Sequence, residues 1–475
     1  MTDNHKNNNQ NQDKQINEAL QQRLQQLLMD LQLDGGPAGG AVVVYQAGKC
    51  IAEVSIGMAR SDVSWQPDTL AINFSTGKGV LATLIHVLVS QQMLDYDVPI
   101  ANYWPAFAAQ DKETITLRSV MSHQANLFSI QSIDVDNEII LDWHTMLNKV
   151  AAMPITPPDN AESYDSAYSA LIYGWVLGGV IEAVTDMSLA EALSQYLTTP
   201  LGIADSCYFG VPDKKIAKVA TLARDFGGLV DDNPAPLTLR NRRHKPTLKV
   251  DSQNTLNTYA NLPSYSCWQQ HTLENQAAAH HDQDNDKIKL SDDKPPVLDT
   301  MQINSLYFNK NHLNLKNYKA ALIPDNKNTL DYHDRATLQA VIPAANGVAS
   351  AQALATIYAM LANGGIWEGQ TLIDNEIVKQ LSVSQVAGLD AVMPAKMYWR
   401  LGYHRVFHFC SDKEANTMDS EWSSFGHMGY NGSVAWCDPK RQLSFAFIHN
   451  FDTTMLHDIR QFALTETVLS LIDDI

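Results

Sequence analysis

Apolar residues recur at helical spacing in the first patterned stretch of the chain. Between Ile16 and Leu33, leucines stand three or four positions apart, at Leu20, Leu24, Leu27, Leu28 and Leu31. This is the pattern of an amphipathic helix with one apolar face. Residues 1–15 before it are rich in Asn and Gln and carry no such pattern, so we expect a disordered tail there.

The pattern changes to that of strands after the glycine- and proline-rich residues 35–40. Residues 41–45 and 50–56 are rich in strand-forming side chains and flank a turn at Ala47-Gly48-Lys49. Two such runs around a short turn predict a pair of adjacent strands. A sheet is therefore expected to begin close to the N-terminus.

The middle of the chain is dominated by helical patterns. Residues 80–94 are apolar on nearly every side, which favours a buried helix because a surface helix needs a polar face. A second helix of this kind is predicted over about 169–184, and turn residues return at 200–203. We expect the region from about 81 to 240 to be mostly helical.

The C-terminal part returns to a mixture of helices and strands. A helix is predicted to begin near Ala351 and to end at Asn363-Gly364-Gly365, where glycine is the usual residue after a helix. Strands are predicted at 434–436 and 443–449, followed by a last helix over about 456–472. The sheet is thus expected to be built from both ends of the chain.

Residues from about 240 to 320 differ from the rest in being polar with little periodicity. We expect a polar insertion or long loop that contributes little to a core, is dispensable for folding and is cut first in limited proteolysis. Its His/Asp run at 280–286 is either a solvated loop or a metal site. Its basic cluster is either a solvated face or an anion-binding patch; the cluster comprises Arg240, Arg242, Arg243, His244 and Lys245.

Composition restricts the class of protein. The 475 residues are 45% hydrophobic and include nine Trp and seventeen Tyr, enough for a large packed core. We expect residues 16–475 to form one domain. The formal charge of -18 would repel nucleic acid and anionic lipid headgroups, so neither is an expected partner.

Cysteines and the N-terminus bear on the cellular compartment. The five cysteines are odd in number, widely scattered and without C-x-x-C spacing, so we expect buried free thiols. The N-terminal residues have no apolar segment typical of a signal peptide, and no later apolar run is long enough to span a bilayer. A cytoplasmic location is expected.

Ser75-Thr76-Gly77-Lys78 combines a hydroxyl and an amine at the start of the first buried helix. Positions i and i+3 lie on one helix face, so the two side chains can meet. A lysine activates a serine only if burial or positive charge lowers its pKa, and the helix N-terminus adds positive field and N–H donors for an oxyanion. From these residues alone, Ser75 is either a nucleophile or a helix-capping serine followed by an ordinary surface lysine.

A second S-x-x-K match, Ser291-Asp292-Asp293-Lys294, shows how weak the spacing is by itself. It lies among charged residues, precedes Pro295-Pro296 and opens no apolar helix. Nothing there would desolvate the lysine. The sequence contains no G-x-S-x-G, H-E-x-x-H, G-x-G-x-x-G or phosphate-binding P-loop motif that would support a rival chemistry.

The text around Ser75 resembles the serine β-lactamase-like superfamily, in particular class C β-lactamases and family VIII carboxylesterases. The resemblance covers about residues 20–470 apart from the polar insertion. It rests on blocks in the expected order at 74–80, 94–95, 103–105, 116–123, 168–175, 200–203, 345–347, 362–365 and 426–432.

The resemblance implies a fold and a set of site residues. The fold would be α/β, an antiparallel sheet flanked by helices with an inserted, mostly helical region. Tyr168 would join Ser75 and Lys78 as a proton carrier, although without the resemblance it would be only a core or rim aromatic residue. Ala170 stands where β-lactamases have the Asn of Tyr-x-Asn, which removes an amide that would help to hold a β-lactam side chain.

The block at 426–432 is similar to the Lys-Thr-Gly strand of β-lactamases, with His427 in place of the lysine. A neutral imidazole would donate one hydrogen bond without a permanent charge, or His427 is merely satisfied beside a glycine-rich turn. The resemblance places Gly429 in the substrate-binding strand. It also implies that the backbone N–H groups of Tyr430 and Ser75 form the oxyanion hole.

By this resemblance the chain is expected to be a serine hydrolase that cleaves short-chain carboxylic esters through an acyl-enzyme, without a metal or cofactor. Its partner would be a small ester or amide. A β-lactamase or D-amino-acid peptidase and an acyltransferase of the same fold are the alternatives among enzymes. A catalytically silent binding or self-assembling scaffold is the alternative outside them. The sequence does not indicate the oligomeric state.

Overall fold

The computed structural model describes residues 17–32, 38–223, 251–281, 296–324, 330–410 and 423–473. The tail expected at 1–15, the basic cluster at 240–245 and the second S-x-x-K match at 291–294 lie outside these residues, as do the side chains of the His/Asp run at 280–286.

One antiparallel sheet of eight strands forms the centre of the molecule, with the order β10-β11-β12-β13-β14-β15-β1-β2. The strands are β1 (Gly40–Gln46), β2 (Lys49–Ile56), β10 (Val386–Leu389), β11 (Lys396–Trp399), β12 (His404–Arg405), β13 (Phe425–Met428), β14 (Val434–Asp438) and β15 (Leu443–His449). Because β1 pairs with β15 along its whole length, the two ends of the chain meet in the sheet. This confirms the predicted α/β fold with its antiparallel sheet.

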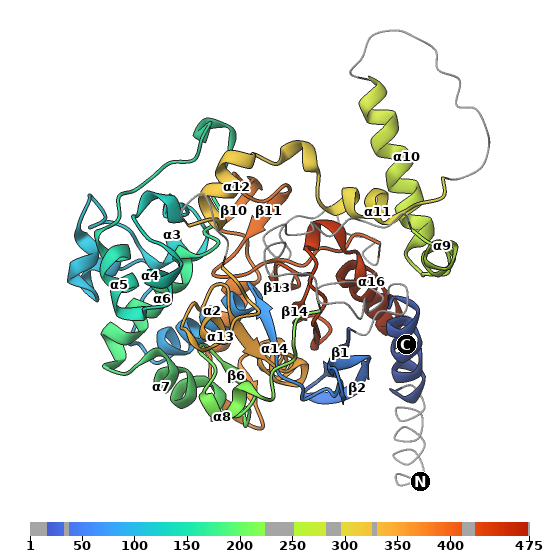
Figure 1. The fold of residues 1–475 in the computed structure, drawn as a ribbon, viewed down its shortest axis with the longest axis horizontal. Coiled ribbons are helices and arrows are strands. Elements are labelled where there is room, and N and C mark those ends of the chain that lie inside the picture. The colour runs from blue at the N-terminus through green and yellow to red at the C-terminus, as the bar shows by residue number, and fades with distance from the viewer. Residues whose placement is uncertain are drawn as a thin grey trace, which may run out of the picture.

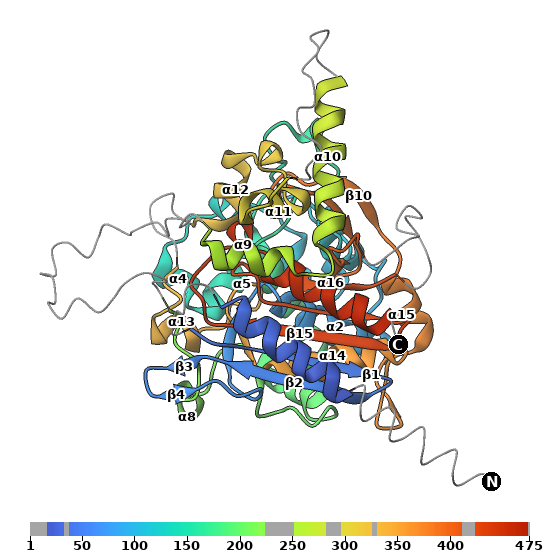
Figure 2. The ribbon, with the colours of Figure 1, turned by 90° about the vertical axis from the view of Figure 1, so that its right-hand side faces the viewer.

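Helices cover both faces of the sheet (Figures 1 and 2). The helix over residues 17–30 and α16 (Arg460–Asp473) lie on one face, and α14 (Ala351–Ala362) and α2 (Gly77–Ser90) on the other. All residues of β15 are buried, as expected of a strand between two helical layers. The Trp436 indole donates to Thr465 Oγ1 on α16 at 3.1 Å, which fixes that helix to β14.

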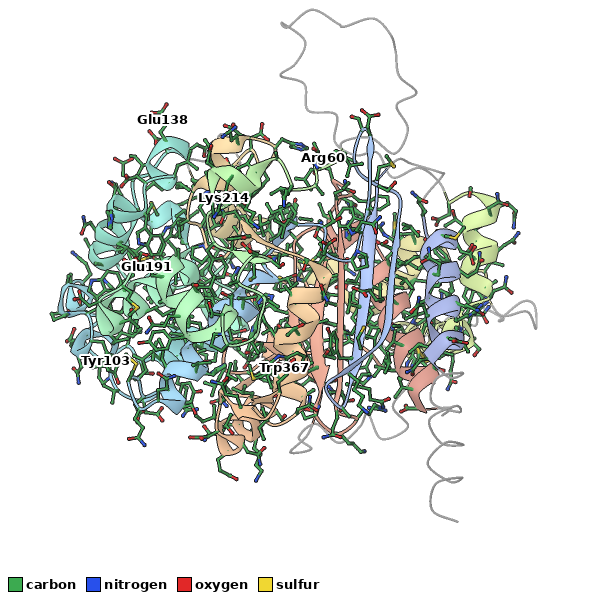
Figure 3. The ribbon with its side chains drawn as sticks, turned by 90° about the horizontal axis from the view of Figure 1, so that it is seen from below. Arg60, Tyr103, Glu138, Glu191, Lys214 and Trp367 are labelled. Atoms are coloured by element: carbon green, nitrogen blue, oxygen red, sulfur yellow. A yellow bond between two sulfur atoms is a disulfide. The ribbon has the colours of Figure 1, made fainter. Side chains whose placement is uncertain are left out.

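A further group of helices forms a region beside the sheet, and charged side chains on these helices, such as Glu138, Glu191 and Lys214, are exposed (Figure 3). Its predicted helix at 169–184 is observed as α6 (Ile172–Thr185) and is largely buried. The other helices there are α3 (Leu117–Met121), α4 (Asn137–Ile140), α5 (Trp143–Ala152), α7 (Leu189–Leu193) and α8 (Asp213–Ile216). The mostly helical character expected for about 81–240 is confirmed for the described residues, which end at 223.

Smaller elements complete the described chain. Between the polar segment and the last strands lie α13 (Arg335–Gln339) and α15 (Asn375–Leu381). Two short hairpins pair β3 (Met58–Arg60) with β4 (Val63–Ser64) and β8 (Ile366–Trp367) with β9 (Gln370–Thr371). Among the helices that the structure describes, none has the length and apolar character needed to cross a membrane.

The polar segment is helical where it is described, which corrects the expectation of a loop with little to add to a core. Trp268, Ile303 and Phe308 are each 0% exposed, so this segment buries large apolar side chains against the rest of the molecule. A few large apolar residues are enough to anchor a segment whose sequence is otherwise polar. The average composition of the segment does not reveal them. Its helices are α9 (Gln253–Ala260), α10 (Tyr265–His281), α11 (Thr300–Tyr307) and α12 (Leu315–Leu322).

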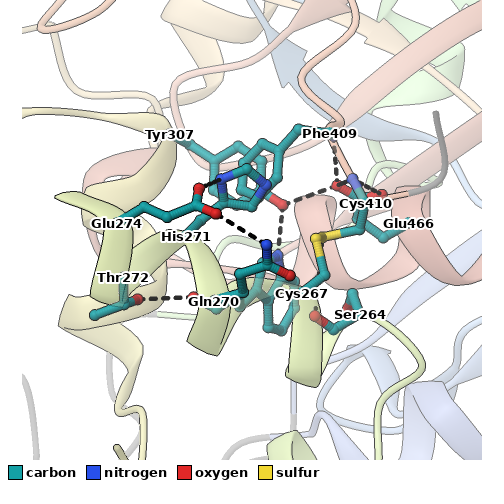
Figure 4. The surroundings of a disulfide bond; sticks show 11 residues. Ser264, Cys267, Gln270, His271, Thr272, Glu274, Tyr307, Phe409, Cys410 and Glu466 are labelled. Carbon is teal, nitrogen blue, oxygen red and sulfur yellow. Dashed lines mark hydrogen bonds and ion pairs between the residues drawn. A yellow bond between two sulfur atoms is a disulfide. The ribbon is translucent and has the colours of Figure 1, made fainter. Parts of the chain in front are cut away.

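A disulfide joins Cys267 on α10 to Cys410 in the segment after β12 (Figure 4). The expectation of buried free thiols is therefore wrong for these two residues. It is confirmed for Cys207 and Cys437, whereas Cys50 is free but exposed. Spacing gave no sign of the pair because the two cysteines are 143 residues apart. Disulfides persist mainly in oxidising compartments, so this bond and the predicted cytoplasmic location point in opposite directions.

Thiol counting tests the disulfide. The oxidised protein, denatured without reductant, should react with three equivalents of a thiol reagent, because three of its cysteines are free. Replacing Cys267 and Cys410 by serine should lower the free energy of unfolding by about 2–4 kcal/mol, since a crosslink restricts the unfolded chain. Five reactive thiols in the oxidised protein would contradict the assignment.

Candidate active site

Ser75 lies where a strand passes directly into a helix. The strand β5 (Ala71–Phe74) pairs with β7 (Gly347–Ala349), which also pairs with β6 (Cys207–Tyr208) in a small separate sheet. Phe74 has a φ of 49°, a left-handed conformation that is rare for a bulky residue and is often found at functional sites. The chain therefore turns sharply just before Ser75, and α2 begins at Gly77.

Lys78 is the first residue that the structure brings to Ser75, as predicted from the i, i+3 spacing. Its Nζ lies 3.1 Å from Ser75 Oγ and donates to the carbonyl oxygens of Ala170 at 2.7 Å and Ala344 at 2.8 Å. The lysine is 0% exposed. Among the described residues no carboxylate forms an ion pair with it.

This environment favours the neutral amine. Burial lowers the pKa of Lys78 well below the usual lysine value, because a charged group without a counter-ion is costly in a desolvated site. A neutral amine has two N–H bonds, and the two carbonyls of Ala170 and Ala344 accept both. The Ser75 hydroxyl lies 3.2 Å from the same Ala344 carbonyl; when it rotates toward Lys78, the lone pair of the neutral amine can take its proton, which is the arrangement that activates a serine.

The block at 345–347 holds one of these carbonyls in place. The Asn346 amide donates to the carbonyls of Thr337 at 2.6 Å and Ala340 at 2.7 Å, and its oxygen accepts from the N–H of Ile342 at 3.0 Å. Asn346 is fully buried. It therefore fixes the turn that presents the Ala344 carbonyl to Lys78.

Tyr168 is the third member of the set. Its phenol is close enough to the Ser75 hydroxyl for that hydroxyl to lower its pKa, and Lys78 Nζ lies 4.8 Å from the centre of its ring. Burial raises the pKa of Tyr168, and the Ser75 hydroxyl partly offsets this rise. The phenol therefore keeps its proton at neutral pH, so Lys78 rather than Tyr168 is suited to be the base.

Asp390 holds Tyr168 in position, and sequence analysis missed it. Its buried carboxylate accepts from the Tyr168 N–H at 3.2 Å, the Ser166 hydroxyl at 2.7 Å and the Trp399 indole at 3.0 Å. The Trp399 ring stacks on the Tyr168 ring at 5.3 Å with an interplanar angle of 1°. Asp390 lies more than two hundred positions from Tyr168, so no local motif links them.

His123, in the block at 116–123, packs against another side of the Tyr168 ring. Its ring lies edge-on to the Tyr168 ring with centres 4.9 Å apart, and its Nδ1 accepts from the Ser169 N–H at 3.2 Å. Burial and the nearby Lys78 lower the pKa of His123. The histidine is therefore neutral at pH 7 and carries its proton on Nε2.

His427 is neutral as expected, but its free nitrogen is an acceptor and not a donor. Nδ1 donates to the Met428 carbonyl at 2.9 Å, so the ring's single proton is used there. Nε2 is buried and has no partner among the described residues. Burial, His404 and Lys78 lower the pKa of His427, so Nε2 can accept a hydrogen bond from a ligand but cannot offer one at neutral pH.

Gly429 allows the block at 426–432 to lie close to the nucleophile. A Cβ at this position would lie 2.4 Å from the Asn73 carbonyl oxygen and 3.0 Å from Thr76 Oγ1, closer than side chains tolerate. The Gly429 N–H donates to the Ser433 carbonyl at 2.6 Å. Gly429 therefore shapes the site through its missing side chain.

Tyr430 follows directly and faces the start of α2. Its ring lies 5.9 Å from the Phe74 ring, and its carbonyl accepts from the Met455 N–H at 2.7 Å. Within the described chain, the backbone N–H groups of Ser75 and Tyr430 donate to no protein acceptor. Two such donors beside a nucleophile are what an oxyanion hole requires.

Metal binding has no support in the described part of the chain, where no three His, Cys, Asp or Glu side chains come together as metal ligands. The site therefore offers a partly exposed serine beside a buried lysine and tyrosine, together with neutral histidines and unpaired backbone N–H groups. This combination on an antiparallel sheet defines a serine hydrolase of the β-lactamase fold.

The comparison with protein families agrees with this assignment of fold and class. The family model named Beta-lactamase matches residues 16–468, so the chain belongs to the β-lactamase family. It is 29% identical over 419 residues to the esterase/β-lactamase LipL of Mycobacterium tuberculosis, covering 87% of this chain and 77% of that protein.

Solved structures share the same fold. A penicillin-binding protein homologue from Caulobacter crescentus superposes with a TM-score of 0.66 and 25% identity over 94% of this chain and 96% of that one. A family VIII carboxylesterase gives a TM-score of 0.61 and 23% identity over 92% and 94% of the two chains. The likeness to the carboxylesterase shows the fold alone.

Proposed function

We propose that the protein hydrolyses neutral, short-chain carboxylic esters through an acyl-enzyme on Ser75. The observation that carries this proposal is the amine of Lys78, buried without a carboxylate partner and hydrogen-bonded to two carbonyls while 3.1 Å from Ser75 Oγ. Such an amine is a base at neutral pH. The relative described as the esterase/β-lactamase LipL supports an ester as one of the possible substrates.

In the first half of the reaction Ser75 Oγ attacks the ester carbonyl carbon while its proton passes to Lys78 Nζ. The carbonyl oxygen becomes an oxyanion bound by the N–H groups of Ser75 and Tyr430. The tetrahedral intermediate then collapses and breaks the bond to the alcohol. The proton on Lys78 reaches the leaving oxygen through the phenol of Tyr168, which gives up its own proton and receives that of Lys78.

In the second half the same groups act on water. Lys78, neutral again, takes a proton from water by way of Tyr168, and the resulting hydroxide attacks the acyl carbon. Collapse of this second intermediate breaks the bond to Ser75, and the proton returns to Ser75 Oγ. The carboxylic acid leaves and the site is restored.

Two substitutions support a neutral ester over a β-lactam. His427 replaces a cationic lysine, and its pKa is lowered by burial, so no permanent charge attracts a substrate carboxylate. Ala170 contributes only its backbone carbonyl to the site, through Lys78, and has no amide to hold a lactam side chain. Both changes weaken recognition of cephalosporins and leave the serine, lysine and tyrosine in place.

A paired activity assay tests this proposal. The protein should hydrolyse p-nitrophenyl acetate or butyrate with kcat/KM at least about 10² above that for a chromogenic cephalosporin, because each unmet recognition contact costs the lactam about tenfold. Faster cephalosporin turnover would favour a β-lactamase. Absence of turnover with both would favour a silent scaffold, and transfer of the acyl group to an added alcohol in preference to water would favour an acyltransferase.

A further inference from the structure

Three tyrosines from separate parts of the chain lie near Phe74 or Tyr168, two residues that neighbour Ser75. Tyr318 comes from α12 of the polar segment, Tyr332 from the loop before α13, and Tyr430 from the loop after β13. All three are partly exposed, whereas Phe74 beside Ser75 is only 5% exposed. Large aromatic side chains left partly exposed next to a nucleophile are available to contact a substrate.

The rings and hydroxyls of these tyrosines are close to one another and to the catalytic set. The rings of Tyr332 and Tyr430 lie 5.0 and 5.9 Å from the Phe74 ring. The phenols of Tyr318 and Tyr430 are close enough for each to shift the pKa of the other, and the phenol of Tyr168 also raises the pKa of Tyr318. Tyr332 likewise interacts with Tyr430 and Tyr168.

Tyr318 is held in this position by the anchoring of α12. The Gln131 amide donates to the Ile323 carbonyl at the end of α12 at 2.8 Å. Asn317, next to Tyr318, exchanges hydrogen bonds with the Asp159 backbone at 2.8 and 3.1 Å. Lys316 forms an ion pair with the Asp159 carboxylate at 2.6 Å. The ring is therefore preorganised, which reduces the entropy lost on binding a substrate.

The wall formed by these rings is uncharged. Burial raises the pKa of Tyr318, Tyr332 and Tyr430, so the phenols are neutral at working pH. The carboxylate of Asp452 also raises the pKa of Tyr430. His333 Nε2 lies 3.1 Å from this carboxylate. A flat, neutral group fits such a surface, because aromatic rings gain more from stacking or edge contacts with another aromatic ring than from an alkyl group of equal size.

We propose that Tyr318, supplied by the polar segment, is a specificity-determining residue that together with Tyr332 and Tyr430 selects esters bearing a neutral aryl group. This deepens and rests on the proposed esterase function. It also gives the polar segment a role in the site, since α12 carries the residue that completes the aromatic wall. The aryl group is taken on either the acyl or the alcohol side of the ester.

Matched substrates test the proposal in the full-length protein. Methyl 3-phenylpropionate is compared with methyl 3-cyclohexylpropionate, and benzyl acetate with cyclohexylmethyl acetate, with ethyl acetate as a small reference ester. The wild-type protein should prefer the aryl member of at least one pair by about fivefold in kcat/KM, the size of effect expected of one or two aromatic contacts. This ratio needs no variant and so does not depend on whether any variant folds.

Two variants of similar volume separate the ring from its hydroxyl. Tyr318→Phe should keep the aryl preference within about twofold, whereas Tyr318→Leu should reduce it about threefold or more. Because the preference is a ratio of two substrates measured on the same variant, a general loss of activity does not change it. Tyr196, a partly exposed tyrosine in the π-helical turn Ser194–Thr198, makes no ring contact with Phe74 or the three tyrosines, so Tyr196→Leu should leave the ratio unchanged.

The outcomes distinguish the two proposals. Ester turnover without an aryl preference, or an aryl preference that survives in Tyr318→Leu, overturns the aryl inference and leaves the esterase function standing. Absence of turnover with every ester, ethyl acetate included, overturns the esterase function and the inference that rests on it. Loss of the aryl preference in Tyr318→Leu with retention in Tyr318→Phe supports both.

Discussion

Replacing Lys78 by methionine should lower kcat/KM for a p-nitrophenyl ester by about 10⁴-fold or more, close to the loss caused by Ser75→Ala. Methionine keeps the length and apolar stem of the side chain and removes the amine that lies 3.1 Å from Ser75 Oγ. Without that amine nothing takes the serine proton. Residues that act as one proton-transfer unit lose function together, so Ser75→Ala/Lys78→Met should be no worse than either single variant.

Lys112→Met is the matched control for this variant. Lys112 is also 0% exposed and donates to three backbone carbonyls, at 2.5 Å from Ala109, 3.0 Å from Ala151 and 2.5 Å from Met153. It lies outside the site, so its replacement should lower stability and leave kcat/KM of the folded protein within about threefold. Wild-type turnover in Lys78→Met would contradict the proposed base.

The same geometry predicts the pH dependence of the reaction. Because burial lowers the pKa of Lys78, the amine is neutral and active above that pKa and is protonated below it. Activity should therefore be complete at neutral pH and fall as the pH decreases through the lowered pKa of Lys78. On the alkaline side, the raised pKa of Tyr168 keeps the phenol protonated, so no loss is expected until strongly alkaline pH. A pH profile of kcat/KM measures both limbs.

Tyr168→Phe should lower kcat by about 10²–10⁴-fold, the usual contribution of a general acid or base. The variant keeps the ring between Trp399 and Lys78 and deletes only the hydroxyl that lies close to Ser75. The melting temperature should change little. Single-turnover kinetics would then show slow acylation and slow deacylation, since the phenol serves both halves.

Tyr173→Phe is the control for the loss of a buried phenol. The hydroxyl of Tyr173 is buried and has no partner among the described residues, so its deletion removes no hydrogen bond. Turnover should remain within about threefold of the wild type. Equal losses in Tyr168→Phe and Tyr173→Phe would mean that the effect is one of packing and not of proton transfer.

The parts of the site that sequence could predict are those set by short spacing or by resemblance. Ser75 and Lys78 are three positions apart at the start of an apolar helix, so their meeting follows from helix geometry. Tyr168 and Tyr430 came only from their places in the family blocks. His427 was predicted as a site residue, but the direction of its hydrogen bond to a ligand was not. That direction depends on the hydrogen bond from His427 Nδ1 to the Met428 carbonyl, which exists only in the folded strand.

The rest depends on contacts between distant segments. Asp390 accepts from donors in two segments, the loop of Ser166 and Tyr168 and strand β11 with Trp399. Tyr318 comes close to Tyr430 from a segment whose polar composition predicted a loop. That segment is helical because a few residues such as Trp268 bury against the body, and an average over eighty residues hides them. The Cys267–Cys410 pair is likewise set by the fold, which brings together residues 143 positions apart.

Covalent labelling shows directly whether Ser75 is the nucleophile. A fluorophosphonate reacts with an activated serine, and peptide mass spectrometry locates the adduct. We expect a single adduct on Ser75. Labelling and esterase turnover should both be lost completely in Ser75→Ala. Ser291→Ala, at the second S-x-x-K match, should be labelled like the wild type. An adduct on any serine other than Ser75, or ester turnover that survives in Ser75→Ala, would contradict the assignment of Ser75 as the nucleophile.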